Sequence, residues 1–160
     1  MLKSLHVSFL VTISSLSWLQ AQVAAEAYIP KTFDEILLAR KGCAEDRIDI
    51  NMCMDLHKYR TRLTFTGEIR PITGKHLEFL NGMKKVWAAQ PELLAVISAY
   101  HQEMLATSNG KRVWIFLQDP LVPEVKQYIK PGGDFLGYLV IPGALKTELQ
   151  FMMTRFDEID

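Results

Sequence analysis

The chain has 160 residues, of which 49% are hydrophobic and 22% charged, a balance typical of one globular domain and not of a disordered chain. Eighteen basic residues balance eighteen acidic ones, so the formal net charge is zero. Broad electrostatic attraction to nucleic acid needs a basic protein, so we expect no nucleic-acid partner.

The N-terminal segment has the pattern of a secretory signal peptide. A single lysine precedes an apolar run from Leu5 to Leu19, and small residues follow. Val23 and Ala25 fit a cleavage site, so we expect a signal peptide over residues 1–25 and a single exported α+β domain over residues 26–160. The run is short for a transmembrane helix, so no stable membrane anchor is expected; an uncleaved N-terminal anchor is the alternative. The expected location is periplasmic or secreted.

Two cysteines, Cys43 and Cys53, lie in the exported part. An even, closely spaced pair in an oxidising compartment predicts a disulfide. The loop is short, so the expected stabilisation is roughly 2–3 kcal/mol. The alternative is a metal pair, but the spacing is not that of a zinc site, and the acidic residues between the cysteines lack the order of a calcium loop. We therefore expect no metal, and a solvated loop or a turn of helix between the two cysteines.

The first elements after the signal peptide have clear local patterns. Thr32 and Glu35 form a capping box, which predicts a helix of about ten residues. Residues 60–72 alternate between apolar and polar side chains, the pattern of a half-buried strand. Gly67, in the middle of that strand, indicates a bulge or a sharp bend.

The middle of the chain is more ambiguous. Residues 75–89 fit either a helix or a hairpin strand that covers residues 76–80. Residues 91–107 carry apolar side chains at three- and four-residue spacing, which predicts one amphipathic helix beginning at Pro91. On that helix His101 and Glu103 do not share a face, and the second histidine of a zinc helix is missing.

The C-terminal part predicts strands with a short helix between them. Apolar, β-favouring runs at residues 112–118 and 135–141 are strands, the second ended by Pro142-Gly143; residues 123–129 are helical turns and residues 148–159 a final strand. This order predicts a small, bent antiparallel β-barrel that resembles the OB-fold, in which a short helix falls between the third and fourth strands. The amphipathic helix packs on it, and the disulfide ties the N-terminal helix to the domain. An SH3-like barrel or an open α+β sheet are the alternatives.

Aromatic and arginine side chains form the candidate interface. In the strand 112–118, alternate residues are apolar on both faces, so the strand is either covered on both sides or open to a ligand on one. Aromatic residues and arginines are typical of protein-interface hot spots, although aromatic residues on strands also fill cores. The candidate interface residues are Trp114, Phe116, Tyr128, Tyr138, Arg62 and Arg70.

No catalytic motif is found in the sequence. Nucleophile elbows and glycine-rich phosphate loops are missing, and the cysteines are expected to be paired. We name no catalytic residue and expect no cofactor.

Residues 110–143 resemble a loose pattern of small exported bacterial proteins of unassigned function. The pattern is a Trp-containing strand that ends in Gln, a short helix, a Pro-Gly or Gly-Asp turn, and a strand that ends in Gly. The resemblance implies a small OB- or SH3-like barrel in the periplasm and no catalytic residue.

The sequence therefore predicts an exported, non-enzymatic binding protein that acts through protein–protein contacts. A sharper version is an inhibitor or immunity protein against a secreted effector, because the fold is small, stapled and without catalytic groups. Two alternatives remain, a small periplasmic hydrolase that uses carboxylates and an envelope-associated structural protein. The first would need acids that converge in one cleft.

Overall fold

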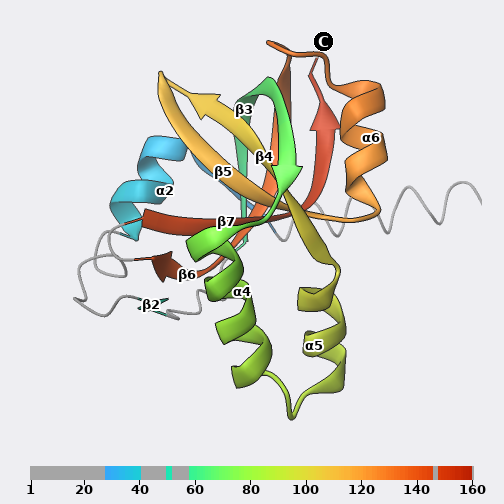
Figure 1. Ribbon diagram of the computed structural model, residues 1–160. Helices are drawn as coiled ribbons and strands as arrows, with labels where there is room; N and C mark the ends of the chain where they lie inside the picture. Colours follow the sequence, from blue (N-terminus) through green and yellow to red (C-terminus); the bar gives the residue numbers. More distant parts are fainter. Residues whose placement is uncertain (1–27, 41–49, 52–57, 146–147, 160) are drawn as a thin grey trace, which may run out of the picture.

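The computed structural model describes residues 28–40, 50–51, 58–145 and 148–159, and these residues form an α+β domain as predicted (Figure 1). The elements in chain order are β1 (Ile29–Pro30), α2 (Phe33–Ala39), β2 (Ile50–Asn51), β3 (Lys58–Pro71), α4 (Gly74–Val86), α5 (Pro91–Ser98), β4 (Tyr100–Ser108), β5 (Lys111–Gln118), α6 (Leu121–Tyr128), β6 (Asp134–Leu145) and β7 (Glu148–Glu158).

The described strands form one sheet with the order β1-β3-β4-β5-β7-β6-β2. Strand β3 pairs with β6 as well as with β4, so the pairings run from β3 through β4, β5, β7 and β6 and return to β3. The prediction of antiparallel pairing is correct for most neighbours but wrong for two pairs, since β5 lies parallel to β7 and β1 parallel to β3.

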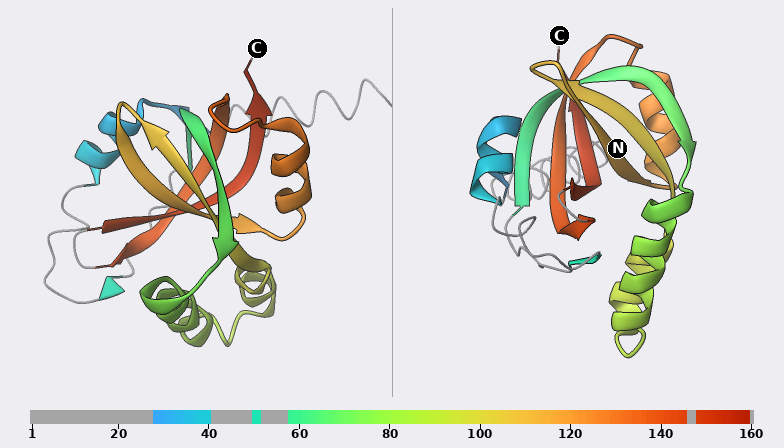
Figure 2. Two further views of the ribbon diagram at one scale, coloured as in Figure 1. Left: turned by 45° about the horizontal axis from the view of Figure 1, so that its top comes forward. Right: turned by 60° about the vertical axis from the view of Figure 1, so that its left-hand side comes forward.

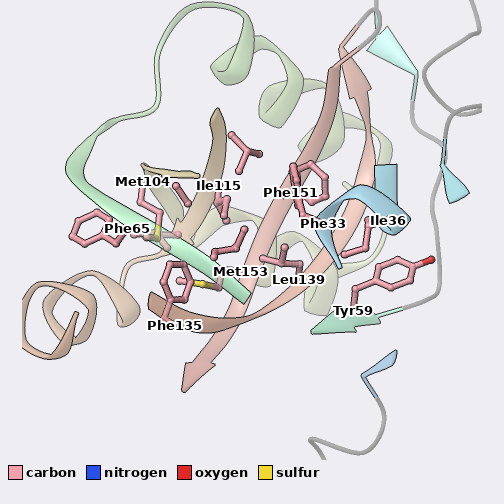
Figure 3. Packing of buried hydrophobic residues seen from close by; sticks show 14 of the residues in the cluster. Phe33, Ile36, Tyr59, Phe65, Met104, Ile115, Phe135, Leu139, Phe151 and Met153 are labelled. Atoms are coloured by element: carbon pink, nitrogen blue, oxygen red, sulfur yellow. The ribbon is translucent and has the colours of Figure 1, made fainter. Parts of the chain in front are cut away.

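The main hydrophobic core lies inside this ring of strands. Figure 3 shows side chains from β3, β4, β5, β6 and β7 that point toward one another, among them Phe65, Ile115 and Phe135. Helix α2 adds Phe33 and Ile36 to this core. Helix α6 adds Val122 and Val125 from the opposite side of the strands in Figure 1.

A second core lies between the outside of the sheet and the two helices α4 and α5. It contains Phe79, Leu80 and Met83 from α4 and Phe116 from β5. The two helices form a hairpin that projects away from the sheet (Figures 1 and 2). Residues 74–98 are thus an arm attached to the sheet.

The predicted helix over residues 91–107 is wrong in its second half. Helix α5 ends at Ser98, and the chain continues as β4, which pairs with β3 on one side and β5 on the other. Because β4 is covered on both faces, the residues from Glu103 to Ala106 are all buried. The apolar residues 104–106 fit the buried stripe of a helix as well as they fit a buried strand.

Three other predictions have clear outcomes. The capping box of Thr32 and Glu35 is present at the start of α2. Residues 74–86 are helical, which decides between the two alternatives for this region. Pro142-Gly143 does not end β6; the pair lies at a register shift against β7, and the strand continues to Leu145.

Gly67 confirms the predicted bulge in β3. The register between β3 and β4 shifts between Phe65 and Ile69, and Gly67 has φ +95°, a conformation that L side chains rarely adopt. A Cβ atom at Gly67 would lie 3.0 Å from the Cβ of Pro131. The turn at Pro131 packs against β3 here, since Gly132 N–H donates to the Phe65 carbonyl at 2.7 Å.

Some predictions fall outside the described residues. The signal peptide over residues 1–25 and the cysteines Cys43 and Cys53 lie there, so export and the disulfide stay predictions. Within the described ranges, none of the helices has the length and apolar character needed to cross a membrane.

Candidate binding cleft

A cleft of about 690 Å³ opens where the start of α2 meets β3. Its walls come from four places in the sequence: the end of β1 with the first turn of α2, the first half of β3, the end of β4 with its turn, and the start of β6. The lining residues are Pro30, Lys31, Thr32, Phe33, Glu35, Arg60, Thr61, Arg62, Thr64, Thr107, Ser108, Asn109, Asp134 and Leu136.

The cleft exists because β3 lacks a neighbouring strand over a short stretch. On this edge β1 pairs with Tyr59 and Arg60, and Lys31 N–H donates to the Arg60 carbonyl at 3.1 Å. The chain then leaves β3, because Thr32 begins α2. Strand β4 covers the same edge only from Thr64 onward.

The register of the sheet explains why β4 stops there. It pairs Thr64 with Thr107, and continuing it by two residues would place Arg62 opposite Asn109. At Asn109 and Gly110, however, the chain turns into β5, with φ +50° and +75°. The turn falls two residues too early for β4 to cover Arg62.

The Arg62 backbone is consequently open on this side. Residues along a strand direct their backbone groups alternately to the two neighbouring strands. Arg60 and Thr64 bond toward β1 and β4, whereas Phe65 bonds to the turn before β6, so the N–H and C=O of Arg62 face the cleft. Among the described residues, no backbone hydrogen bond to either group is found.

The two carboxylates in the cleft already have partners. Asp134 Oδ1 accepts from the Thr64 hydroxyl at 2.6 Å, and Asp134 Oδ2 accepts from the Arg62 guanidinium, also at 2.6 Å. These contacts hold the pKa of Asp134 below its usual value. Glu35 Oε2 accepts from the backbone N–H of Thr32 at 2.7 Å and from its hydroxyl at 2.8 Å, which lowers the pKa of Glu35 in the same way. Both acids are therefore ionised at neutral pH.

This ionisation bears on the hydrolase alternative. A pair of catalytic carboxyls needs one member that stays protonated near neutral pH, and such a group has a raised pKa. Glu35 and Asp134 line one cleft, but both pKa values are lowered. Neither residue suits the role of a general acid.

Side-chain contacts that we call the Asp34 clamp join α2 to the turn between β4 and β5 at the rim of the cleft. Asp34 in α2 accepts hydrogen bonds from Lys111 Nζ at 2.5 Å and from Asn109 Nδ2 at 3.1 Å. The contact with Lys111, followed by that with Asn109, lowers the pKa of Asp34. The clamp fixes the turn between β4 and β5 against α2, and so fixes the width of the gap.

Thr61 lines the cleft, and its side chain carries a buried polar group without a partner among the described residues. The residue is 2% exposed, and its hydroxyl is the one buried side-chain polar atom without a hydrogen-bond partner in the described part of the chain. A buried hydroxyl without a partner costs free energy, so such groups are rare and mark places where a partner is missing.

A second polar cluster lies at the other end of β3, where the hairpin joins the sheet. Glu103 of β4 is fully buried, and its carboxylate accepts from Arg70 Nε at 2.7 Å and lies 2.5 Å from His76 Nδ1. The Arg70 guanidinium also stacks on the Trp114 ring, 3.6 Å from its centroid. Three elements, β3, α4 and β4, are joined by this one carboxylate.

The structure separates the six candidate interface residues. Arg70 and Trp114 lie together beside Glu103, Arg62 is in the cleft, and Tyr128 is exposed on α6. Phe116 and Tyr138 are buried, at 0% and 2% exposure, so proposing them as interface residues was wrong. Phe116 lies in the core under the hairpin, because that face of β5 is covered.

Sequence reasoning missed most of the residues of both polar regions. Glu103 and His76 were assigned to a helix and to an ambiguous segment, although an acid inside the apolar run at 104–106 is itself a signal of a buried partner. Asp134 directly follows the turn residues Pro131-Gly132-Gly133, and the sequence gives no sign that its carboxylate reaches Arg62 and Thr64. No group of three or more metal-ligating side chains is found among the described residues.

No family model matches the chain, and a search of curated proteins finds no significant match. The resemblance of residues 110–143 to small exported proteins therefore stays a prediction.

Proposed function

We propose that the chain is an exported binding protein that acts through contacts with another protein, built on an OB-like barrel. The ring of pairings through β3, β4, β5, β7 and β6 supports the barrel, because the OB-fold is a five-stranded Greek-key barrel. The position of α6 between the third and fourth strands of this ring supports it as well.

The projecting hairpin of α4 and α5 carries this proposal. Seven large hydrophobic side chains are exposed among the described residues, and four of them, Leu77, Val86, Leu93 and Val96, lie on the hairpin. Leu93 and Val96 are three residues apart, so they share one side of α5. An arm that projects from a domain and exposes apolar side chains is typical of an element that docks on a partner.

The charges near the tip of the hairpin indicate the chemistry of the partner surface. Lys84 and Lys85 end α4, next to Val86, and the nearest acid along the chain beyond them is Glu92. We therefore propose a protein partner with an apolar groove bordered by acidic side chains. Such borders steer association and set specificity, while the apolar contacts supply the affinity.

The experiment is a comparison of two surface variants in capture from a lysate of the source cells. Val86→Asp with Val96→Asp alters the hairpin, and Tyr128→Asp on α6 is the control, since all three side chains are about half exposed. We expect the unaltered chain and the control to retain the same exported protein and the hairpin variant to lose it. Capture that is equal for both variants, or no stoichiometric partner at all, would contradict the proposal.

The identity of the captured protein decides among the functions within this class. A secreted antibacterial enzyme as partner makes the chain an inhibitor or immunity protein. A component of the cell envelope makes it an accessory or structural protein.

A further inference from the structure

We infer that the cleft is a second binding site, which takes the carboxyl-terminal end of an extended peptide against the open edge of β3 at Arg62. The inference does not depend on the hairpin, which lies at the far end of β3. It rests on the backbone of Arg62, on the length of the gap and on the charges of the walls.

The backbone of Arg62 provides the recognition groups. Its N–H and C=O both face the cleft and have no backbone partner among the described residues. An extended peptide that lies beside a strand edge exchanges hydrogen bonds with groups of this kind, the mode known as strand addition. One peptide residue opposite Arg62 would satisfy both groups.

The length of the gap selects the end of a chain. Strand β1 covers the edge up to Arg60, and β4 covers it from Thr64, so only residues 61–63 are open. Three residues of a strand span roughly 10 Å. A peptide that continued along β3 in both directions would run into β1 and β4, so the segment must end inside the cleft.

The charges of the walls select a carboxylate over an ammonium group. Three cationic side chains line the cleft, those of Lys31, Arg60 and Arg62, against the two carboxylates. Both carboxylates are engaged by groups of the protein itself, Glu35 by Thr32 and Asp134 by Thr64 and Arg62. The Arg62 guanidinium is itself held by Asp134, so Lys31 and Arg60, against Glu35, leave the unbalanced charge positive, and a carboxylate at a chain end complements it.

The probe is the peptide N-acetyl-Ala-Ala-Ala with a free carboxylate, titrated into the ¹⁵N-labelled protein. We expect the Arg62 amide to shift downfield and its hydrogen exchange to slow by about tenfold or more at saturation. The same peptide with a carboxamide end should bind at least about tenfold more weakly, since it lacks the charge-assisted contacts. If saturating free-acid peptide leaves the Arg62 amide unchanged, the inference is wrong.

Matched variants separate the cleft from general charge effects. Lys31→Gln should weaken binding of the free-acid peptide several-fold and leave the weak binding of the carboxamide unchanged. Lys126→Gln removes an exposed cation from α6, outside the cleft, and should change neither. Equal weakening by both variants would contradict the cleft as the site. The peptide contains no surface that could bind the hairpin, so a failed peptide titration leaves the hairpin proposal standing. A failed capture experiment with the hairpin variants likewise leaves the cleft proposal standing.

Discussion

At the Arg70 end of β3 the buried carboxylate of Glu103 has two partners, Arg70 and His76. At the Arg62 end a buried hydroxyl and the backbone groups of a strand edge have no hydrogen-bond partner among the described residues. The two regions belong to one strand and are separated by the bulge at Gly67. Before the bulge β3 is hydrogen-bonded mainly to β6, and after it to β4.

The difference shows which polar groups serve the fold and which are left for a ligand. Desolvating a charge such as Glu103 is costly, and only a full set of partners makes it tolerable. The Glu103 cluster therefore fixes the hairpin to the sheet. The cleft has the same kinds of groups but is incomplete, as expected of a surface that another molecule completes.

The largest effect should come from breaking the complete cluster with Glu103→Gln. The variant keeps the shape but loses the charge that holds Arg70 and His76, so we expect a loss of about 2–3 kcal/mol in the free energy of unfolding, the range of charge-assisted hydrogen bonds. Chemical denaturation measures it. Glu68→Gln, an exposed position on the neighbouring strand β3, is the control and should stay within about 0.5 kcal/mol of the parent.

The bulge that separates the two regions is tested by Gly67→Ala. The backbone at φ +95° is strained for alanine, and the new Cβ would lie 3.0 Å from Pro131, so a loss of about 2 kcal/mol is expected. Gly82→Ala is the control, because nothing lies within 4 Å of its added Cβ and its helix favours alanine. A Gly67→Ala variant as stable as the parent would show that the bulge is not constrained.

In the cleft region, removing a polar group should raise the stability of the protein and not lower it. Thr61→Val keeps the shape of the side chain and removes the unpaired hydroxyl, so we expect a gain of up to about 1 kcal/mol in unfolding free energy. Thr64→Val is the matched control, since it removes a hydroxyl that donates to Asp134 and should lose stability. A destabilised Thr61→Val would mean that the hydroxyl has a partner in solution.

The smallest effect concerns pH. The folded-state pKa of Asp134 is lowered, so its contribution to stability is present above the ordinary aspartate pKa and is lost as the pH falls through the folded-state value. The melting temperatures of the parent and of Asp134→Asn should differ slightly at pH 6 and converge well below pH 4. A difference that grows on acidification would contradict the assignment.

Local signals predicted local structure well. The capping box at Thr32, the alternation along β3 and the glycine at the bulge each depend on residues that are near neighbours in sequence. The α+β class and the helix between β5 and β6 followed from them. The helix predicted over 91–107 failed because β4 is specified by pairing with two other strands, and its buried run carries no period.

The cleft could not be predicted from the sequence, for a related reason. It arises from the register of β3 against β4 and from the place where the turn at Asn109 interrupts that register. The turn signal of Asn109-Gly110 is visible in the sequence, but its distance from Arg62 across the sheet is not. Arg62 was a candidate for its side chain, whereas the structure draws attention to its backbone.

The most direct test of this account is native-state hydrogen exchange of β3 in the free protein, read residue by residue by NMR. Thr61 and Leu63 direct their backbone groups to β6, so their amides should be protected at least about a hundredfold more than that of Arg62. Fast exchange at Arg62 between two slow neighbours would establish the open edge. Equal protection at all three residues would show that the edge is already occupied, and the cleft would lose its central feature.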